Sequence, residues 1–269
     1  MGRNKTGYSS DTKKHLLLGA GAIFKNFNVG QDTYENAKAK IVGATQGGNE
    51  FKAVPAVRSI QVDGILGKAK DLDVIDSWDV SLTVTFLEAS VQVIRAALGA
   101  SKLDTTDSSY DEITADTEFK LEDYFDNITY IGTIAGAKKP VIIQLYNAIN
   151  MGGLTVKGQD TAEGTIQVVF EGRYTIENQD DAPFDIYYPK MLKATPDSVT
   201  ITGTASVDVA ISGAQGNVSV SSADTSVATA SYSTNEVEIT GVAPGKTYIT
   251  VTDGDGNVIR IAVTVVAGE

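Results

Sequence analysis

Hydrophobic and polar residues alternate most regularly between positions 78 and 86. Every second position there is hydrophobic: Trp78, Val80, Leu82, Val84 and Phe86. A period of two places alternate side chains on opposite faces of a strand, so this segment predicts a β-strand with one buried face. Trp78, at its start, is predicted to anchor the core. Shorter runs of the same kind predict strands at 60–62, 128–134, 141–146 and 166–176.

One segment has helical spacing instead. Val91, Ile94 and Leu98 fall on one face of a helix predicted over residues 90–98. Ser90 is the expected N-cap, and Gly99 supplies the stop. A second, weaker helix is predicted over 121–125.

Three segments lack either period and are predicted to be long loops. They are residues 1–22, 43–56 and 100–118; the second holds three glycines and Pro55. Long loops in a compact domain are usually functional or disordered. We expect 1–22 and 43–56 to be arms that become ordered on a neighbouring copy of the chain.

The composition changes near residue 193. Of 20 aromatic residues, 18 precede this point, and the remainder of the chain is rich in Thr, Ser, Val and Ala. Pro189 and Pro196 flank the junction, which predicts domains at 1–190 and 193–269. Turn signals at regular intervals in the second domain predict a small β-sandwich. Its expected strands are 198–201, 206–211, 218–221, 227–232, 236–239, 248–253 and 258–265.

The net charge of −12 argues against a protein that binds nucleic acid through its phosphates. Acidic residues cluster at positions 71–79 and 177–181, and we weigh a channel wall against ordinary solvated surface for each cluster. The chain has no cysteine, so disulfides and thiolate metal sites are excluded. Lys13 and Lys14 precede a short apolar run, but no A-x-A site follows, and no signal peptide is expected. No apolar stretch reaches the about 18 residues of a membrane helix.

Candidate chemistry is sparse. Residues 19–24 begin like a dinucleotide fingerprint, but Phe24 replaces the third glycine, so flexible backbone is the better interpretation. Asp253, Asp255 and Asn257 have the initial spacing of a calcium loop, yet Thr264 stands where the final Glu belongs, which favours a hairpin turn. His15 is the single histidine. We therefore predict no catalytic residue, no cofactor, no metal site and no enzyme activity.

The second domain resembles the bacterial Ig-like domains of group 2. Four stretches carry the resemblance: 194–199 (ATPDSV), 221–229 (SSADTSVAT), 239–245 (ITGVAPG) and 249–253 (ITVTD). Pro196 is expected to begin an edge strand. Gly245 is expected to supply the positive φ of a turn after Pro244.

The first domain is similar to the major tail tube proteins of siphophages. The resemblance is carried by 43–51 (GATQGGNEF), by 55–64 and 67–70, and by 76–78 (DSW) with the strand that follows. It implies a mainly β fold: a tail-tube-type β-sandwich or barrel with a flanking helix, followed here by the Ig-like β-sandwich. It also implies homohexameric rings stacked into a tube, with the Ig-like domain projecting outwards.

Further partners follow from that resemblance. They are the tape measure protein, the tail terminator and distal tail proteins, and duplex DNA that passes through the channel without tight binding. The location implied is the virion, after assembly in the host cytoplasm, with no membrane partner. Lys13, Lys14, Lys138 and Lys139 are expected at subunit contacts or outside the tube. The alternative is a secreted or surface adhesin that binds host-surface glycans through the Ig-like domain.

Overall fold

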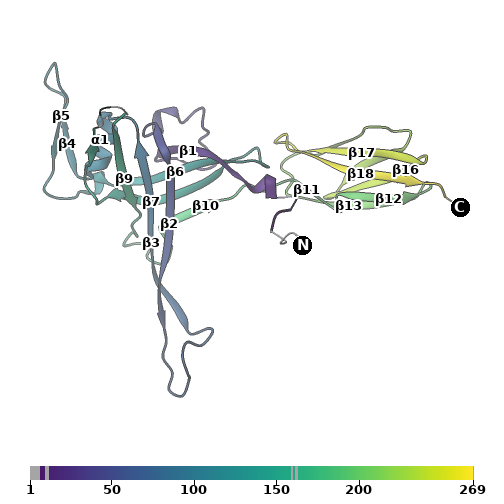
Figure 1. The fold of residues 1–269 in the computed structure, drawn as a ribbon, viewed down its shortest axis with the longest axis horizontal. Coiled ribbons are helices and arrows are strands. Elements are labelled where there is room, and N and C mark those ends of the chain that lie inside the picture. The colour runs from purple at the N-terminus through teal and green to yellow at the C-terminus, as the bar shows by residue number, and fades with distance from the viewer. Residues whose placement is uncertain (1–6, 10–11, 159, 161–162, 269) are drawn as a thin grey trace. The chain divides into compact units, whose positions relative to one another are not determined.

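The computed structural model describes residues 7–9, 12–158, 160 and 163–268, and the fold is mainly β (Figure 1). The chain forms two compact units, each described here by itself. The N-terminal unit comprises residues 18–133 and 141–187. The C-terminal unit comprises residues 1–17, 134–140 and 188–269. The domain limits 1–190 and 193–269 stay a prediction.

An eight-stranded sheet builds the N-terminal unit. Its strand order is β1-β6-β7-β9-β3-β2, with β10 added to β7 and β8 added to β9. A separate hairpin pairs β4 with β5. The bounds are β1 Leu17–Lys25, β2 Thr45–Ser59, β3 Asp73–Phe86, β4 Ser101–Asp104, β5 Glu112–Ala115, β6 Phe125–Ile134, β7 Val141–Asn150, β8 Val156–Lys157, β9 Thr165–Glu171 and β10 Phe184–Tyr187. Short 3-10 turns cover Thr12–His15, Lys38–Lys40 and Leu121–Asp123.

The alternating pattern of β3 gives it one buried face, as the sequence predicts. Val80, Leu82, Val84 and Phe86 are all buried, and the residues between them are not. Its partner β9 contributes buried Ile166, Val168 and Phe170 in the same alternation. The two strands are in antiparallel register from Ser81↔Glu171 to Phe86↔Ile166, so their hydrophobic positions share one face.

Helix α1 (Val91–Leu98) is confirmed with both of its ends. The Ser90 hydroxyl accepts a hydrogen bond from the Val93 N–H, at 3.3 Å. Gly99 closes the helix with a φ of 77°, where a side chain would be strained. The buried face of α1, with Val93, Ala96 and Ala97, packs against β7 and β9.

The prediction of a loop at 43–56 is wrong, because most of this segment is strand β2. Gly47 and Gly48 have φ of 83° and 91° and lie where the pairing register shifts between Thr45 and Asn49. The glycines therefore form a bulge within a strand and do not mark a loop. Pro55 is tolerated because β2 lies at the edge of the sheet.

Several shorter segments also differ from their predictions. Segment 100–118 contains the β4–β5 hairpin, and 17–22 belongs to β1, paired with β6. Strand β9 ends at Glu171, well before residue 176, and 60–62 lies beyond the end of β2. The weak helix at 121–125 is a single 3-10 turn. Residues 17–22 and 45–56 form strands within a single chain, which contradicts the expectation that they become ordered only on a neighbouring copy. Residues 1–6 and 10–11 of the first predicted arm lie outside the described part.

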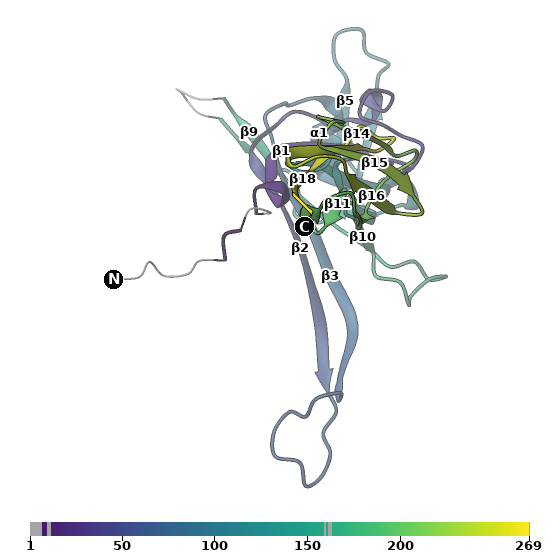
Figure 2. The ribbon, with the colours of Figure 1, turned by 90° about the vertical axis from the view of Figure 1, so that its right-hand side faces the viewer.

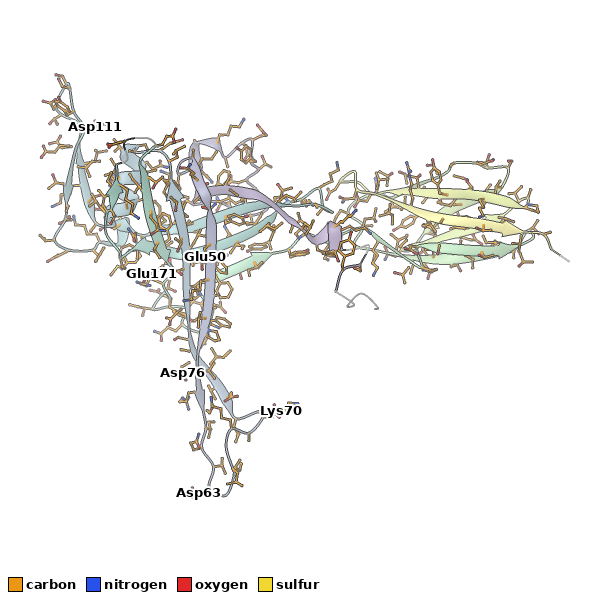
Figure 3. The ribbon with its side chains drawn as sticks, in the orientation of Figure 1. Glu50, Asp63, Lys70, Asp76, Asp111 and Glu171 are labelled. Carbon is orange, nitrogen blue, oxygen red and sulfur yellow. The ribbon has the colours of Figure 1, made fainter. Side chains whose placement is uncertain are left out.

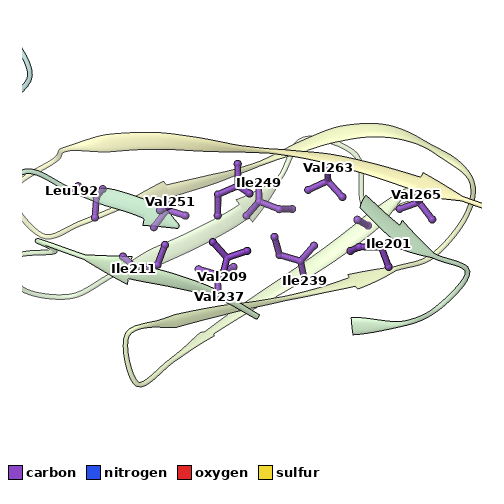
Figure 4. Close-up of a cluster of buried hydrophobic side chains, with 13 residues drawn as sticks. Leu192, Ile201, Val209, Ile211, Val237, Ile239, Ile249, Val251, Val263 and Val265 are labelled. Atoms are coloured by element: carbon purple, nitrogen blue, oxygen red, sulfur yellow. The ribbon is translucent and has the colours of Figure 1, made fainter. Parts of the chain in front are cut away.

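The C-terminal unit contains a sandwich of two four-stranded sheets. Their orders are β11-β13-β16-β15 and β12-β18-β17-β14. Alternating Val and Ile side chains from both sheets meet in one core, which includes Val209, Val237, Ile249 and Ile261 (Figure 4). The bounds are β11 Lys193–Thr195, β12 Ser198–Thr202, β13 Ser206–Ser212, β14 Ser219–Ser222, β15 Ala228–Ser233, β16 Glu236–Gly241, β17 Gly245–Thr252 and β18 Val258–Val266.

Seven predicted strands of this sandwich are confirmed, and β11 was missed because it is only three residues long. The role predicted for Gly245 is wrong. Its φ is not positive, and the residue is the first of strand β17. A Cβ at this position would lie 2.9 Å from Cγ2 of Val227, so the close approach of that side chain requires the glycine.

Two further segments complete the C-terminal unit. The Lys14 carbonyl accepts a hydrogen bond from the Gly136 N–H at 2.8 Å. Lys139 forms an ion pair with Asp255 at 2.8 Å, and the Lys138 N–H donates to the Asn257 side chain at 3.2 Å. The turn between β6 and β7 thus contacts the loop between β17 and β18.

Candidate functional site

A long hairpin extends from the N-terminal unit. We call residues 54–76 the arm and residues 60–72, which lie beyond the last β2–β3 pair Ser59↔Asp73, the arm tip. Figures 1 and 2 both show the arm leaving the sheet, free of other elements of its unit. Exposed hydrophobic side chains follow its length: Val54, Val57, Ile60, Val62, Ile65, Leu66 and Ile75. Leu66 is fully exposed.

Charged residues are interleaved with these hydrophobic ones. Arg58 pairs with Asp76 at 3.1 Å, and Asp73 accepts a hydrogen bond from the Ser59 hydroxyl. Lys68 and Lys70 have no ion-pair partner within the described part of the chain. Lys70 and Asp63 lie near the far end of the arm (Figure 3). The predicted acidic cluster at 71–79 is therefore located on the arm and at its base.

Aromatic residues hold the base of the arm. Trp78 contacts Phe184 with ring centroids 5.5 Å apart, and Phe51 contacts the same ring at 5.6 Å. The backbone N–H of Trp78 donates to the hydroxyl of Tyr174 at 2.8 Å. Trp78 is half-buried, so its predicted role as a core anchor is wrong. It packs where the arm joins the sheet.

A polar pocket of about 480 Å³ lies beside this base. Strands β6, β7 and β10 and the segment after β9 supply its walls. Three carboxylates line it, together with aromatic rings and one guanidinium: Asp126, Asp181, Asp185, Tyr146, Tyr174, Phe184 and Arg173. We call it the arm-base pocket.

The charge of the arm-base pocket is unbalanced. The Arg173 guanidinium is held by Glu171 at 2.6 Å and by the Gly172 carbonyl at 3.2 Å. Asp126 has no hydrogen-bond or ion-pair partner among the described residues. Asp181 accepts one hydrogen bond, from the Asn178 amide, at 2.6 Å. The pocket therefore presents more negative than positive charge to whatever enters it.

The Tyr146 hydroxyl links the polar wall of the arm-base pocket to polar groups in the interior. Its hydroxyl donates to Asp185 at 2.8 Å and lies 3.3 Å from the Gln144 amide oxygen. Burial raises the pKa of Tyr146 strongly, and the hydrogen bonds with Tyr187 and Asp185 raise it further. The phenol is therefore a hydrogen-bond donor at every physiological pH.

Behind Tyr146 lies a buried network. The Gln144 amide donates to the Phe27 carbonyl at 2.7 Å and to Thr129 at 3.0 Å. Asn127 pairs with both backbone groups of Phe27, at 2.9 and 3.2 Å. The buried side chains of Asn127, Thr129 and Gln144 are thereby satisfied, and the network fixes strands β6 and β7 against the segment after β1.

The candidate calcium loop is a structural turn. The Asp253 carboxylate is 5% exposed and accepts hydrogen bonds from the backbone of Gln215, Asp255 and Asn257 and from the Asn257 amide, at 2.9 to 3.1 Å. Burial works against ionisation, but these donors outweigh it and lower the pKa of Asp253. Within the described ranges no group of three acidic or histidine residues could hold a metal.

Two of the remaining candidates lie apart from the arm-base pocket, and one contributes to it. His15 lies 3.0 Å from the hydroxyl of Tyr188, in the C-terminal unit. Residues 19–24 form part of strand β1, with positive φ at Gly19 and Gly21. The acidic cluster at 177–181 contributes Asp181 to the pocket wall. Among the helices of the described chain, none is long and apolar enough to cross a membrane.

Comparison with known proteins identifies the C-terminal sandwich. Residues 191–263, about a quarter of the chain, match the family model of the bacterial Ig-like domain (group 2). This confirms that part of the predicted resemblance. No curated protein matches the chain.

One solved structure aligns with most of the chain, the crystal structure of the S-layer protein rSbsC(31-844). The alignment has 13% identity and a TM-score of 0.27 and covers 95% of this chain and 41% of that one. The chain thus spans about two fifths of that protein's length, and a superposition of this quality carries no argument. None of the comparisons indicates a tail tube protein.

Sequence analysis missed the arm-base pocket. Its lining comes from three separate segments, and Asp126, Tyr146 and Arg173 belong to no motif. The one available signal was the polar residues Gln144 and Tyr146 in the hydrophobic run 141–146. Polar side chains within a buried strand need partners, which indicates a network at that place.

Proposed function

We propose that this chain is a structural subunit that assembles with copies of itself into stacked hexameric rings, forming the tail tube of a siphophage. In this proposal it has no enzyme activity, and the Ig-like domain decorates the outside of the tube. The family resemblance of residues 43–86 supplies the architecture. The observation that carries the proposal is the arm.

The arm exposes many hydrophobic side chains to water, which is unfavourable for a hairpin without a partner. Its seven exposed hydrophobic side chains occupy both strands and the tip. A two-stranded hairpin alone is marginally stable, and many exposed hydrophobic side chains gathered on one hairpin are typical of an interaction surface. A second copy of the chain is always available to cover this surface, because it is present at the same concentration as the first.

Microscopy of the purified protein tests this proposal. Negative-stain images at rising protein concentration should show rings and then tubes. A chain that stays monomeric at every concentration, by images and by light scattering, would contradict the proposal.

The proposed tube also has a defined relation to DNA. A net charge of −12 per chain, repeated around each ring, should repel phosphates, so duplex DNA would pass without being held. We expect assembled tubes to show no measurable duplex binding at physiological salt. Retention of labelled duplex on sedimented tubes would contradict this part of the proposal.

An adhesin is the second candidate, and the match to the bacterial Ig-like domain favours it. In that case the Ig-like domain would bind surface glycans, and the chain would have no need to polymerise. A glycan array with the whole chain separates the two functions. Saturable glycan binding by a protein that forms no rings would favour the adhesin.

A further inference from the structure

We propose that the arm tip of one copy binds in the arm-base pocket of another copy, with Lys68 and Lys70 placed against Asp126 and Asp181. This inference rests on the proposed self-assembly and names the surface that receives the arm. The proposal commits to a second copy of this chain as the occupant of the pocket.

The lining of the arm-base pocket is complementary to a cation carried on an apolar stem. Three carboxylates line it, and its guanidinium is already neutralised by Glu171. Tyr146, Tyr174 and Phe184 provide aromatic surface beside those carboxylates. A lysine side chain offers both matching parts, because its four methylenes pack on rings while its ammonium pairs with carboxylates.

The arm tip supplies such groups. Lys68 and Lys70 are exposed, and within the described residues neither has an ion-pair partner. Leu66 and Ile65, just before them, are exposed hydrophobic residues. The tip also contains Asp63 and Asp71, so its net charge is zero. Recognition therefore depends on which part of the loop enters the pocket, and the proposal places Lys68 and Lys70 there.

A tip cannot reach the pocket of its own copy. The β2–β3 pairs run along the arm from Val54↔Asp79 to Ser59↔Asp73 with one register shift, between Ala56 and Val57, so the two strands stay paired up to the arm tip. The pocket lies at the other end, where Tyr174 and Phe184 contact Trp78. Figure 3 shows Lys70 far from the base of the arm. Occupation therefore requires a second copy.

Charge reversal on each side tests the contact with the full chain. One variant carries Lys68→Glu and Lys70→Glu, a second carries Asp126→Lys and Asp181→Lys, and a third combines all four changes. Lys246→Glu and Asp208→Lys, on exposed strands of the Ig-like domain, are the matched controls. Thermal melts establish that each monomer is folded, and light scattering with negative-stain images gives the critical concentration for assembly.

We expect each two-residue variant to raise the critical concentration at least about tenfold, which corresponds to about 1.4 kcal/mol per contact. The four-residue variant should return to within about threefold of the unchanged chain, because its reversed arm fits its reversed pocket. The two controls should assemble normally. Assembly of both two-residue variants at the original concentration would overturn the inference, and so would a four-residue variant that folds but fails to recover.

The same experiment distinguishes the two proposals. An unchanged chain that never assembles overturns the proposed function and this inference with it. An unchanged chain that forms tubes, while the charge-reversed variants form them equally well, overturns the inference alone.

Discussion

Two glycines in strand β1 share a backbone conformation but differ in their surroundings. Gly19 and Gly21 have φ of 74° and 75°. A Cβ on Gly19 would meet nothing within 4 Å, whereas a Cβ on Gly21 would overlap the ring of Tyr130. The flexible-backbone interpretation of this segment therefore holds for neither glycine: both sit in a strand, and Gly21 makes room for a buried ring.

This pair gives a controlled prediction. Gly19→Ala should cost about 1 kcal/mol for its strained φ. Gly21→Ala should cost about 1–3 kcal/mol more, because Tyr130 is buried and has to move. Chemical denaturation of both variants measures the difference. Equal costs would show that Tyr130 relaxes freely.

Asp253 stabilises the Ig-like domain through its turn. Asp253→Asn keeps the shape but replaces a carboxylate that accepts four hydrogen bonds, so we expect a loss of about 1.5–3 kcal/mol near pH 7. Asp208→Asn, on an exposed face of β13, should change stability by less than about 0.5 kcal/mol.

The pH dependence of this effect has a defined sign. The pKa of Asp253 is lower in the folded protein than in the unfolded chain, where it is about 3.9. Its stabilisation is therefore complete above that value and is lost as the pH falls through the folded pKa. Thermal melts from pH 7 to pH 3 should show the gap between the unchanged chain and Asp253→Asn closing at the acidic end.

Among the helices and strands, predictions from local sequence patterns are confirmed where the local sequence determines the structure. The Ig-like strands alternate Val or Ile with polar residues between clear turns, and helix α1 has both a cap and a stop. Strand β2 was not predicted, because its glycines and Pro55 lower its intrinsic β-propensity. Its conformation is set by pairing with β3 along nearly its full length, which a local pattern cannot reveal.

The arm tip should be dispensable for folding. Replacing residues 60–72 with an Asn-Gly turn should leave the melting temperature within a few degrees, because these residues contribute no fully buried side chain. Tube formation should be lost. Calorimetry and electron microscopy on the same preparation check both parts; a tip-deleted chain that still forms tubes would place the essential contact elsewhere.

For the whole molecule, the Ig-like domain should be dispensable for assembly. The composition change near residue 193 suggests truncation there, but Leu192 belongs to the core of the sandwich and Lys193 begins β11. A chain ending at Pro189 is the cleaner variant. It loses the Lys139–Asp255 pair, which is largely exposed and worth at most about 1 kcal/mol. Rings or tubes in micrographs of this truncation are the expected result, and a folded but monomeric product would contradict it.

The candidate site was the part least accessible from sequence. The hydrophobic periods predicted two of the strands that contribute to the arm-base pocket, β6 and β7. The pocket itself depends on how three segments converge in space, and no spacing along the chain records that convergence.

An arm at one place and its receiving pocket at another make the arm–pocket contact heterologous, and where such contacts join one ring to the next they give the tube a direction. One terminus would display free arms, and the other would display empty pockets. The two termini should then elongate at different rates. A chain with a shortened arm could still accept an arm in its pocket but could not offer one, so a few per cent of it should cap growing polymers and shorten them.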